Sequence, residues 1–218
     1  MRPYYEADGI TIYHGDCREI VPRLAFSGLV VSDPPYGINH PTDYAARGRG
    51  NLTACRDYAP VHGDAAPFDP GWLLSVGSGR ILWGANHYAD KLPPSGGWLV
   101  WDKERPDDLD QATCELAWTD CVKGVRRHRQ LWNGMMRAGT DTLQHPTQKP
   151  VALMRWCLST RWTDTGDVLD PFMGSGTTLR AAKDLGRRAI GIEIEERYCE
   201  IAAKRLGQRV LFGAEASA

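Results

Sequence analysis

The sequence predicts a protein of the α/β class, in which a mainly parallel sheet is covered by helices on both faces. Short apolar runs alternate with segments of helical periodicity, an order typical of parallel sheets with helical crossovers. The 218 residues suffice for one domain with a sizeable core, and 42% hydrophobic and 24% charged residues are ordinary for a globular chain. We therefore expect residues 1–218 to form a single domain.

The first half of the chain contains the earlier strands. The runs at 10–14 and 29–32 each lead to an acidic residue in a turn, Asp16 and Asp33. The stretch from about 40 to 66 shows no sustained period and is predicted to be a loop. Further strands are predicted in the apolar runs that contain Trp83, Trp98, Trp101 and Trp118, at 80–84, 97–102 and 114–119, and most of these tryptophans are expected in the core.

Basic residues gather where the pattern breaks down, between about 120 and 144. Lys/Arg residues at 123, 126, 127, 129 and 137 are opposed there only by acids at 120 and 141. The whole chain has a formal net charge of -1, so any nucleic-acid partner must be met by such a local patch.

The last third alternates helices with strands. A helix is predicted from Pro150, because proline suits the first helical position and apolar residues from Val151 to Leu158 share a face. A strand at 167–170, a helix from about 176 to 185, and a strand at 189–193 follow. The final helix has acids at its start and bases at its end, as the helix dipole favours.

Several classes of protein are disfavoured by what the sequence lacks. Six cysteines without a Cys-x-x-Cys pair argue against a zinc knuckle and a disulfide framework, so we expect reduced thiols. The histidines show no ligand spacing, so no metal is proposed. No apolar run approaches the roughly 20 residues of a membrane helix, and the amino terminus lacks a secretory apolar region. The expected location is cytoplasmic, away from membranes.

A glycine-rich turn follows the strand at 167–170. In the segment Asp170-Pro-Phe-Met-Gly-Ser-Gly-Thr-Thr178 an acid ends a strand and the turn opens a helix, so backbone amides can approach a ligand. Glu193 ends the next strand, where a carboxylate can accept two ribose hydroxyls. A phosphate loop is excluded because no lysine precedes Thr177, and Leu179 replaces the third glycine of a dinucleotide fingerprint. A nucleoside pocket is predicted.

The tetrapeptide Asp33-Pro34-Pro35-Tyr36 is the second motif. Two prolines fix the backbone after a buried strand, so the Asp33 carboxylate and the Pro34 carbonyl can converge as acceptors. Two acceptors fit an exocyclic amine with its two N–H donors, and the Tyr36 ring can stack on a planar base.

These motifs resemble those of the amino-group DNA methyltransferases that use S-adenosylmethionine. The order, catalytic tetrapeptide first and Phe172-Met-Gly-Ser-Gly176 last, is similar to that of the permuted beta group. The resemblance implies a Rossmann-like methyltransferase fold with a mostly parallel seven-stranded sheet and a circularly permuted motif order. It also implies that the segments at about 40–66 and 120–144 are a loop and a small target-recognition insertion.

The resemblance implies a site as well. Asp33, Pro34, Pro35 and Tyr36 would be catalytic, and Asp16 would read the adenine of the cofactor. The segment from His145 to Pro150 is similar to one that flanks the methionine end of the cofactor. The implied cofactor residues are Asp16, Cys17, Asp33, Lys149, Asp170, Pro171, Phe172, Gly174, Ser175, Gly176, Thr177, Thr178 and Glu193.

The expected activity is site-specific methylation of the N6 amino group of an adenine flipped out of double-stranded DNA. Arg47 and Arg49 in the loop, and Lys123, Arg126, Arg127 and Arg129 in the basic segment, are the candidate DNA contacts. A thiol nucleophile for cytosine C5 is disfavoured, because in the family that uses one it follows a proline, and none of the six cysteines does.

Other activities stay open at this stage. Methylation of cytosine N4 needs the same geometry, although in the family Asp at the first tetrapeptide position leans toward adenine and Ser toward cytosine. An RNA or protein-glutamine methyltransferase would have its cofactor turn first, and a non-catalytic DNA-binding module would have a damaged site. An unaccompanied enzyme of phage or prophage origin is favoured, and a homodimer is left open.

Overall fold

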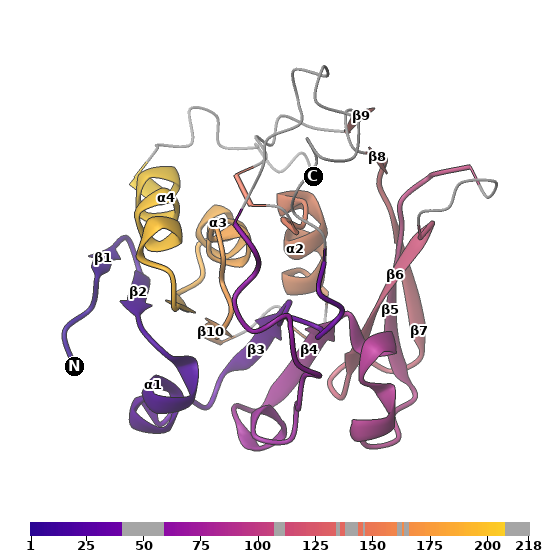
Figure 1. Ribbon diagram of the computed structural model, residues 1–218, viewed down its shortest axis with the longest axis horizontal. Coiled ribbons are helices and arrows are strands. Elements are labelled where there is room, and N and C mark those ends of the chain that lie inside the picture. The colour runs from indigo at the N-terminus through magenta and orange to yellow at the C-terminus, as the bar shows by residue number, and fades with distance from the viewer. Residues whose placement is uncertain are drawn as a thin grey trace.

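The computed structural model describes residues 1–40, 59–106, 112–133, 136–137, 144–145, 147–160, 163 and 166–207. It confirms the α/β class, with a large sheet between two layers of helices (Figure 1). Among these residues no helix is long and apolar enough to cross a membrane.

The main sheet has nine strands in the described chain, two more than the seven predicted. In spatial order they are β1 (Tyr5–Ala7), β2 (Ile10–His14), β11 (Ala189–Glu193), β10 (Val168–Asp170), β3 (Leu29–Ser32), β4 (Gly79–Trp83), β6 (Cys114–Thr119), β5 (Gly97–Asp102) and β7 (Val125–Arg129). β2, β11, β10, β3 and β4 run parallel, β6 is antiparallel to both of its neighbours, β7 is parallel to β5, and β1 is antiparallel to β2.

The sequence missed β1 and β7, which are the two edges of the sheet. An edge strand needs only one neighbour, and it can be polar on both faces. Only Val125 is apolar in Val-Arg-Arg-His-Arg, and its side chain is 61% exposed, so no alternation marked the strand. Part of the segment at 120–144, predicted to be an insertion, therefore forms β7 (Val125–Arg129) and extends the main sheet. A short pair, β8 (Trp132–Asn133) with β9 (Met136–Arg137), follows it.

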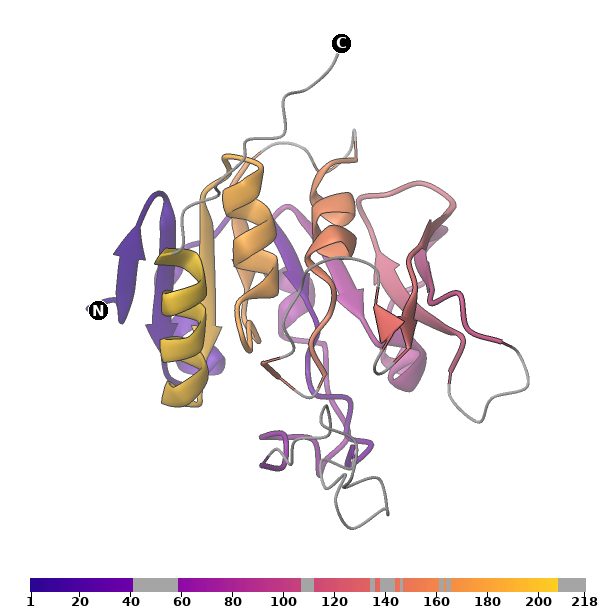
Figure 2. The same ribbon diagram turned by 90° about the horizontal axis from the view of Figure 1, so that it is seen from above.

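Helices cover both faces of the sheet. α2 (Val151–Leu158), α3 (Thr177–Asp184) and α4 (Glu196–Gly207) lie in a row on one face, and α1 (Cys17–Leu24) lies on the other with the 3-10 turns η2 (Leu73–Ser75), η3 (Ala85–His87) and η4 (Ala89–Lys91) (Figures 1 and 2). The sequence indicated only a polar link where α1 forms. Its eight residues contain Pro22, which obscured the helical pattern, although Asp16 caps the helix and Ile20 and Val21 are buried.

Successive side chains of the central strands point to opposite faces and belong to two separate hydrophobic cores. Along β3, Leu29 and Val31 pack with α2, α3 and α4, whereas Val30 points to the side of α1. Ile81 and Leu82 of β4 divide in the same way. The predicted core tryptophans Trp83, Trp101 and Trp118 are buried, and Trp98 is partly buried. The cysteines that the structure describes are free thiols, as expected.

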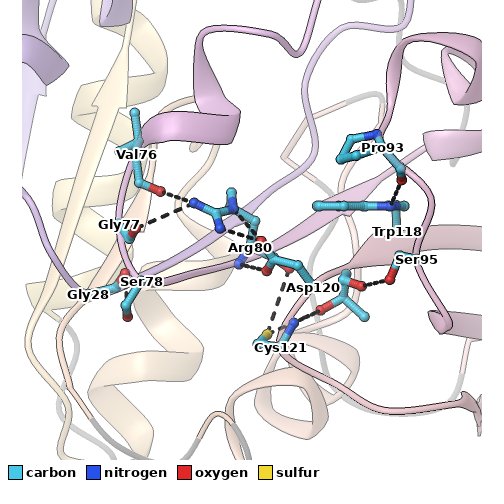
Figure 3. A network of polar contacts seen from close by, with 11 residues as sticks. Gly28, Val76, Gly77, Ser78, Arg80, Pro93, Ser95, Trp118, Asp120 and Cys121 are labelled. Carbon is cyan, nitrogen blue, oxygen red and sulfur yellow. Dashed lines mark hydrogen bonds and ion pairs between the residues drawn. The ribbon is translucent and has the colours of Figure 1, made fainter.

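Arg80 and Asp120 join the start of β4 to the end of β6, at the amino ends of the parallel strands. The Arg80 backbone amide donates to Asp120 Oδ1 at 2.8 Å, its Nε donates to Asp120 Oδ2 at 2.6 Å, and its Nη1 donates to the Val76 carbonyl at 3.0 Å (Figure 3). Asp120 is therefore bound to Arg80, and it does not neutralise the basic residues that follow it.

Candidate active site

The two motifs meet where the order of the sheet reverses. β3 and β10 are neighbours, but the chain passes from β3 outward to β4 and from β10 outward to β11. Ligands of open α/β sheets bind in the crevice at such a point, beyond the carboxyl ends of the strands. The Ser32 hydroxyl donates to Asp170 Oδ1 at 2.8 Å, directly joining the end of β3 to the end of β10.

Asp170 shapes the glycine-rich turn from inside. Its side chain is buried, and Oδ1 also accepts the Phe172 amide at 3.1 Å. Burial raises the pKa of Asp170 to about 6, against the opposing effect of hydrogen bonds from Thr178 and Ser32. The structure thus gives this predicted cofactor residue a supporting position beneath the turn.

Glu193 holds the turn from the neighbouring strand. Its Oε2 accepts the Gly174 amide at 3.0 Å, and its Oε1 accepts the Glu195 amide at 2.8 Å. Gly174 has a φ of +51°, which glycine adopts at little cost. Burial raises the pKa of Glu193 to about 7, although the backbone amides that it accepts oppose the shift. A carboxylate has about four lone-pair sites, so Glu193 keeps capacity for further donors.

The remaining residues of the turn are largely internal. Ser175 donates to Gln148 Oε1 at 3.1 Å, and Thr177 accepts from Arg205 at 3.2 Å. Gly176 is needed for packing, because a Cβ there would lie 2.9 Å from the Cβ of Ala202 in α4. Pro171 and Thr178 are also buried.

Aromatic rings and the end of β2 border the turn. Phe172 lies edge-on to Phe68, with 5.7 Å between ring centroids. The Gly15 amide donates to the Glu193 carbonyl at 2.9 Å, which brings Asp16 beside Glu193. Asp16 Oδ1 accepts the Arg18 amide at 2.8 Å as the cap of α1, and Cys17 is buried. Asp16 and Glu193, both predicted at the cofactor, are thus neighbours at the ends of β2 and β11.

His145 lies against the turn from the segment before α2. A Cβ on Gly174 would be 3.6 Å from its ring, and the ring packs on Tyr198 with 4.4 Å between centroids. Burial, with the charges of Arg197 and Lys149, lowers the pKa of His145 to about 4. The imidazole is thus neutral at physiological pH.

The Asp33 carboxylate already has two side-chain donors. The Tyr36 hydroxyl donates to Oδ1, and Lys149 Nζ donates to Oδ2 at 2.5 Å. Lys149 Nζ also lies 3.1 Å from the Tyr36 hydroxyl. Burial raises the pKa of Asp33, the Lys149 ammonium opposes this shift, and the charge of Glu115 adds to it. Lys149, predicted at the cofactor, is placed here beside the tetrapeptide.

The ring of Tyr36 is held in a fixed orientation. It stacks on His87 with 5.0 Å between centroids and 13° between planes. Gly84, at a φ of +71°, lies so close that a Cβ would be 1.9 Å from Tyr36 Cε1. Pro34 is buried and Pro35 is partly buried, so the whole tetrapeptide is fixed in place.

Two charged residues that the sequence analysis did not select complete the site. Glu115 of β6 pairs with Lys149 at 3.0 Å and with Lys103 at 2.5 Å. Lys103 follows β5 and is 8% exposed. A glutamate within the apolar run at 114–119 was the available signal, but its partners depend on the strand register.

Asp64 was also missed. Its Oδ1 accepts the Gly37 amide at 2.8 Å, its Oδ2 accepts the His40 amide at 2.6 Å, and its carbonyl accepts the Asn39 amide at 2.9 Å. Asp64 is 5% exposed. This cluster of bonds fixes the chain as it leaves the tetrapeptide.

The predicted DNA contacts are only partly described. Arg47 and Arg49 lie outside the described residues, whereas Arg126, Arg127 and Arg129 are exposed on β7 and Lys123 is exposed before it. Asp102 lies 3.9 Å from Arg127 and 3.3 Å from Arg129. Ion pairs of this exposure are weak and compatible with exchange for phosphate.

Comparison with known proteins gives consistent matches. A family profile described as DNA methylase, N6_N4_Mtase, matches residues 79–204. The Type II methyltransferase M2.LlaDCHI of Lactococcus lactis subsp. cremoris is 37% identical, over 97% of this chain and 94% of that protein. The crystal structure of the M1.HpyAVI–SAM complex matches at 26% identity with a TM-score of 0.55, over 91% of this chain and 100% of that chain. The cytosine-N4-specific PvuII DNA methyltransferase has a TM-score of 0.62 over 97% of this chain and 91% of that chain, but at 14% identity it shows likeness of fold alone.

Proposed function

Because this chain belongs to the N6_N4_Mtase family of DNA methylases, which modify amino groups of bases, we propose that its target is the N6 amino group of an adenine flipped out of duplex DNA. The fold is the Rossmann-like methyltransferase fold. The methyl donor of the family is S-adenosylmethionine, and M1.HpyAVI was solved in complex with it.

The bond between Ser32 and Asp170 is the observation that carries the proposal. It places the tetrapeptide and the glycine-rich turn at adjacent strand ends, at the reversal point of the sheet. An amine held by Asp33 and a nucleoside held near Glu193 would therefore share one crevice. A purely structural turn would not require an amine-binding motif beside it.

The residues around the turn fit S-adenosylmethionine. Burial disfavours the charge of Glu193, and two further hydroxyl donors from a ribose would stabilise that charge. Asp16 lies next to Glu193 and can accept from an adenine amine, and Phe172 contributes an aromatic edge. When bound, the cofactor supplies an electrophilic methyl group.

Asp33 and Pro34 would prepare the target amine. The lone pair of an aromatic amine is delocalised into the ring, and acceptors on both N–H bonds favour a tetrahedral nitrogen with a localised lone pair. The nitrogen must lose a proton after gaining a methyl group. Burial raises the pKa of Asp33, which suits this carboxylate to receive that proton. Asp at this position supports adenine over cytosine.

The basic strand β7 offers a surface for DNA phosphates. β7 runs parallel to β5, so Arg129 lies at the carboxyl ends of the parallel strands, as the site does, and is paired with Asp102. Arg127 precedes Arg129 by two residues, which is roughly 7 Å along the strand. Phosphate contacts at this edge would position a duplex so that one base can enter the crevice.

Methylation mapping tests the assignment directly. DNA from cells that express the chain should carry N6-methyladenine at one recurring sequence, and N4-methylcytosine there would replace the adenine proposal. Asp33→Ala should abolish transfer while S-adenosylmethionine binds within a few-fold of the wild type by calorimetry. Asp167→Ala, which removes an exposed carboxylate paired with Arg188, is the matched control and should be active. Preserved turnover in Asp33→Ala would exclude Asp33 as the amine acceptor.

A further inference from the structure

Two carboxylates and two ammonium groups form a continuous chain at the site. Lys103 Nζ lies 2.5 Å from Glu115 Oε1, and Lys149 Nζ lies 3.0 Å from Glu115 Oε2 and 2.5 Å from Asp33 Oδ2. The lysine side chains are only 9% and 6% exposed. Lys149 thus bridges the carboxylate assigned to the target amine and a second carboxylate that the proposed chemistry does not use.

The sheet brings these groups together from distant parts of the sequence. Glu115 lies opposite Trp101 in the antiparallel pairing of β6 with β5, so it reaches the edge where β5 ends and Lys103 follows. Asp33 follows β3 at the same edge, because β3, β4 and β5 share one direction. Lys149 enters from the segment before α2.

The occupied state of Asp33 poses a physical problem for substrate entry. Its Oδ1 has the Tyr36 hydroxyl and its Oδ2 has the Lys149 ammonium. A carboxylate oxygen can accept a second donor, but a target amine that takes the position of Lys149 at Oδ2 requires the ammonium to move aside. A buried ammonium that loses its only carboxylate would be strongly destabilised. Lys149 avoids this outcome, because Glu115 is already within ion-pair distance.

We propose that Glu115 is a positioning residue for methyl transfer, which retains Lys149 when the target amine displaces it from Asp33. The inference rests on the proposed function of Asp33. In the free protein Lys149 occupies the place of an amine donor. In the complex its ammonium stays on Glu115, and the freed Asp33 oxygen accepts the N–H of the base.

The charges of the cluster support this exchange. Burial would raise the pKa of Glu115, but Lys149 and Lys103 lower it to about 2, so Glu115 stays ionised. Burial opposes the charge of Lys149, yet Asp33 and Glu115 outweigh it and raise its pKa. Lys103, whose Nζ lies 5.0 Å from the centroid of the Trp101 ring, anchors Glu115 from the other side.

Glu115→Gln tests the exchange. Among the described residues, the neutral amide leaves Asp33 as the only carboxylate paired with Lys149, so the lysine competes more strongly with the target amine. We expect kcat to fall by about tenfold or more. The affinities for S-adenosylmethionine and for unmethylated genomic DNA should stay within about twofold, because cofactor and phosphate contacts lie elsewhere.

A double-mutant cycle separates positioning from mere support of the fold. Lys149→Met removes the competing ammonium, so adding Glu115→Gln in that background should change kcat by less than about twofold. Independent losses that multiply in the double variant would overturn the proposal. Thermal unfolding of all three variants reports stability separately.

A spectroscopic readout follows Lys149 in the wild-type chain, with one variant used only to assign the resonance. The ammonium resonance of Lys149, identified by its absence in Lys149→Met, should shift when the mapped target duplex is added with S-adenosylhomocysteine. A scrambled duplex should leave it unchanged. A resonance that does not move with the target duplex overturns the exchange. If Asp33→Ala is inactive but Glu115→Gln turns over like the wild type, the exchange alone fails and the proposed function stands.

Discussion

Gly84→Ala should disable the site through the ring of Tyr36 alone. Gly84 has a φ of +71°, and an added Cβ would lie 1.9 Å from Tyr36 Cε1 and 2.2 Å from Cζ. Ordinary contact begins at 3.4 Å, so the ring must retreat by 1.5 Å, the difference between 3.4 and 1.9 Å. The ring cannot retreat freely, because His87 stacks on it and its hydroxyl donates to Asp33.

The substitution Gly84→Ala should lower both stability and turnover, and the loss of stability has two contributions. A left-handed backbone costs a non-glycine residue about 1–2 kcal/mol, and crowding in a packed region costs about 1–3 kcal/mol more. Displacement of a positioned group by about 1 Å can lower turnover by about 100-fold. Cofactor affinity should persist, since the Glu193 side of the crevice is untouched.

Gly186→Ala is the matched control. Gly186 has nearly the same backbone angle, a φ of +67°, but an added Cβ would meet nothing within 4 Å. Gly186→Ala should therefore lose only the stability that a left-handed backbone costs a non-glycine residue, and it should keep full activity. The assay is transfer of a labelled methyl group to genomic DNA, with thermal unfolding of each variant. Equal activity of the two variants would refute the claim that the Tyr36 ring position controls turnover.

Two further predictions concern the cofactor and DNA. The raised pKa of Glu193, about 7, means that the carboxylate gains a proton as pH falls through that value. The affinity for S-adenosylmethionine should therefore weaken below about pH 7 and become independent of pH in Glu193→Gln; a wild-type affinity that calorimetry finds constant from about pH 6 to 8 would contradict this. Arg127→Ala combined with Arg129→Ala should flatten the slope of log DNA affinity against log salt by about one unit per lost phosphate contact. Arg188→Ala, on an exposed ion pair with Asp167, should not change that slope.

The motifs could be predicted from sequence because their geometry is local. Two prolines after a strand fix the backbone of the tetrapeptide whatever surrounds it, and a glycine at a φ of +51° marks the turn at Gly174. The order of strands and helices then predicted a parallel sheet, and the structure confirms the strands at 10–14, 29–32 and 189–193. The adjacency of Glu193 and the turn also follows from that order.

The rest of the site depends on the register of the strands, which the periodicity of the sequence does not specify. Glu115 reaches Lys103 and Lys149 only because β6 pairs with β5 so that Glu115 faces Trp101. A shift of one residue would turn its side chain to the other face. β7 was missed because its side chains are mostly charged and exposed, so nothing in its pattern separates a sheet edge from a solvated segment.

The bonds around Asp64 protect the tetrapeptide from changes in the sequence between residues 40 and 64. The chain leaves the tetrapeptide at His40 and is tied back to it at Asp64 through main-chain amides, which every residue type except proline supplies. The ends of the intervening sequence are therefore held together independently of its content. Lengthening a segment whose two ends are joined in this way costs little, since closure entropy grows only slowly with length. Insertions or exchanges between these two ends should therefore leave Asp33 and Tyr36 in position.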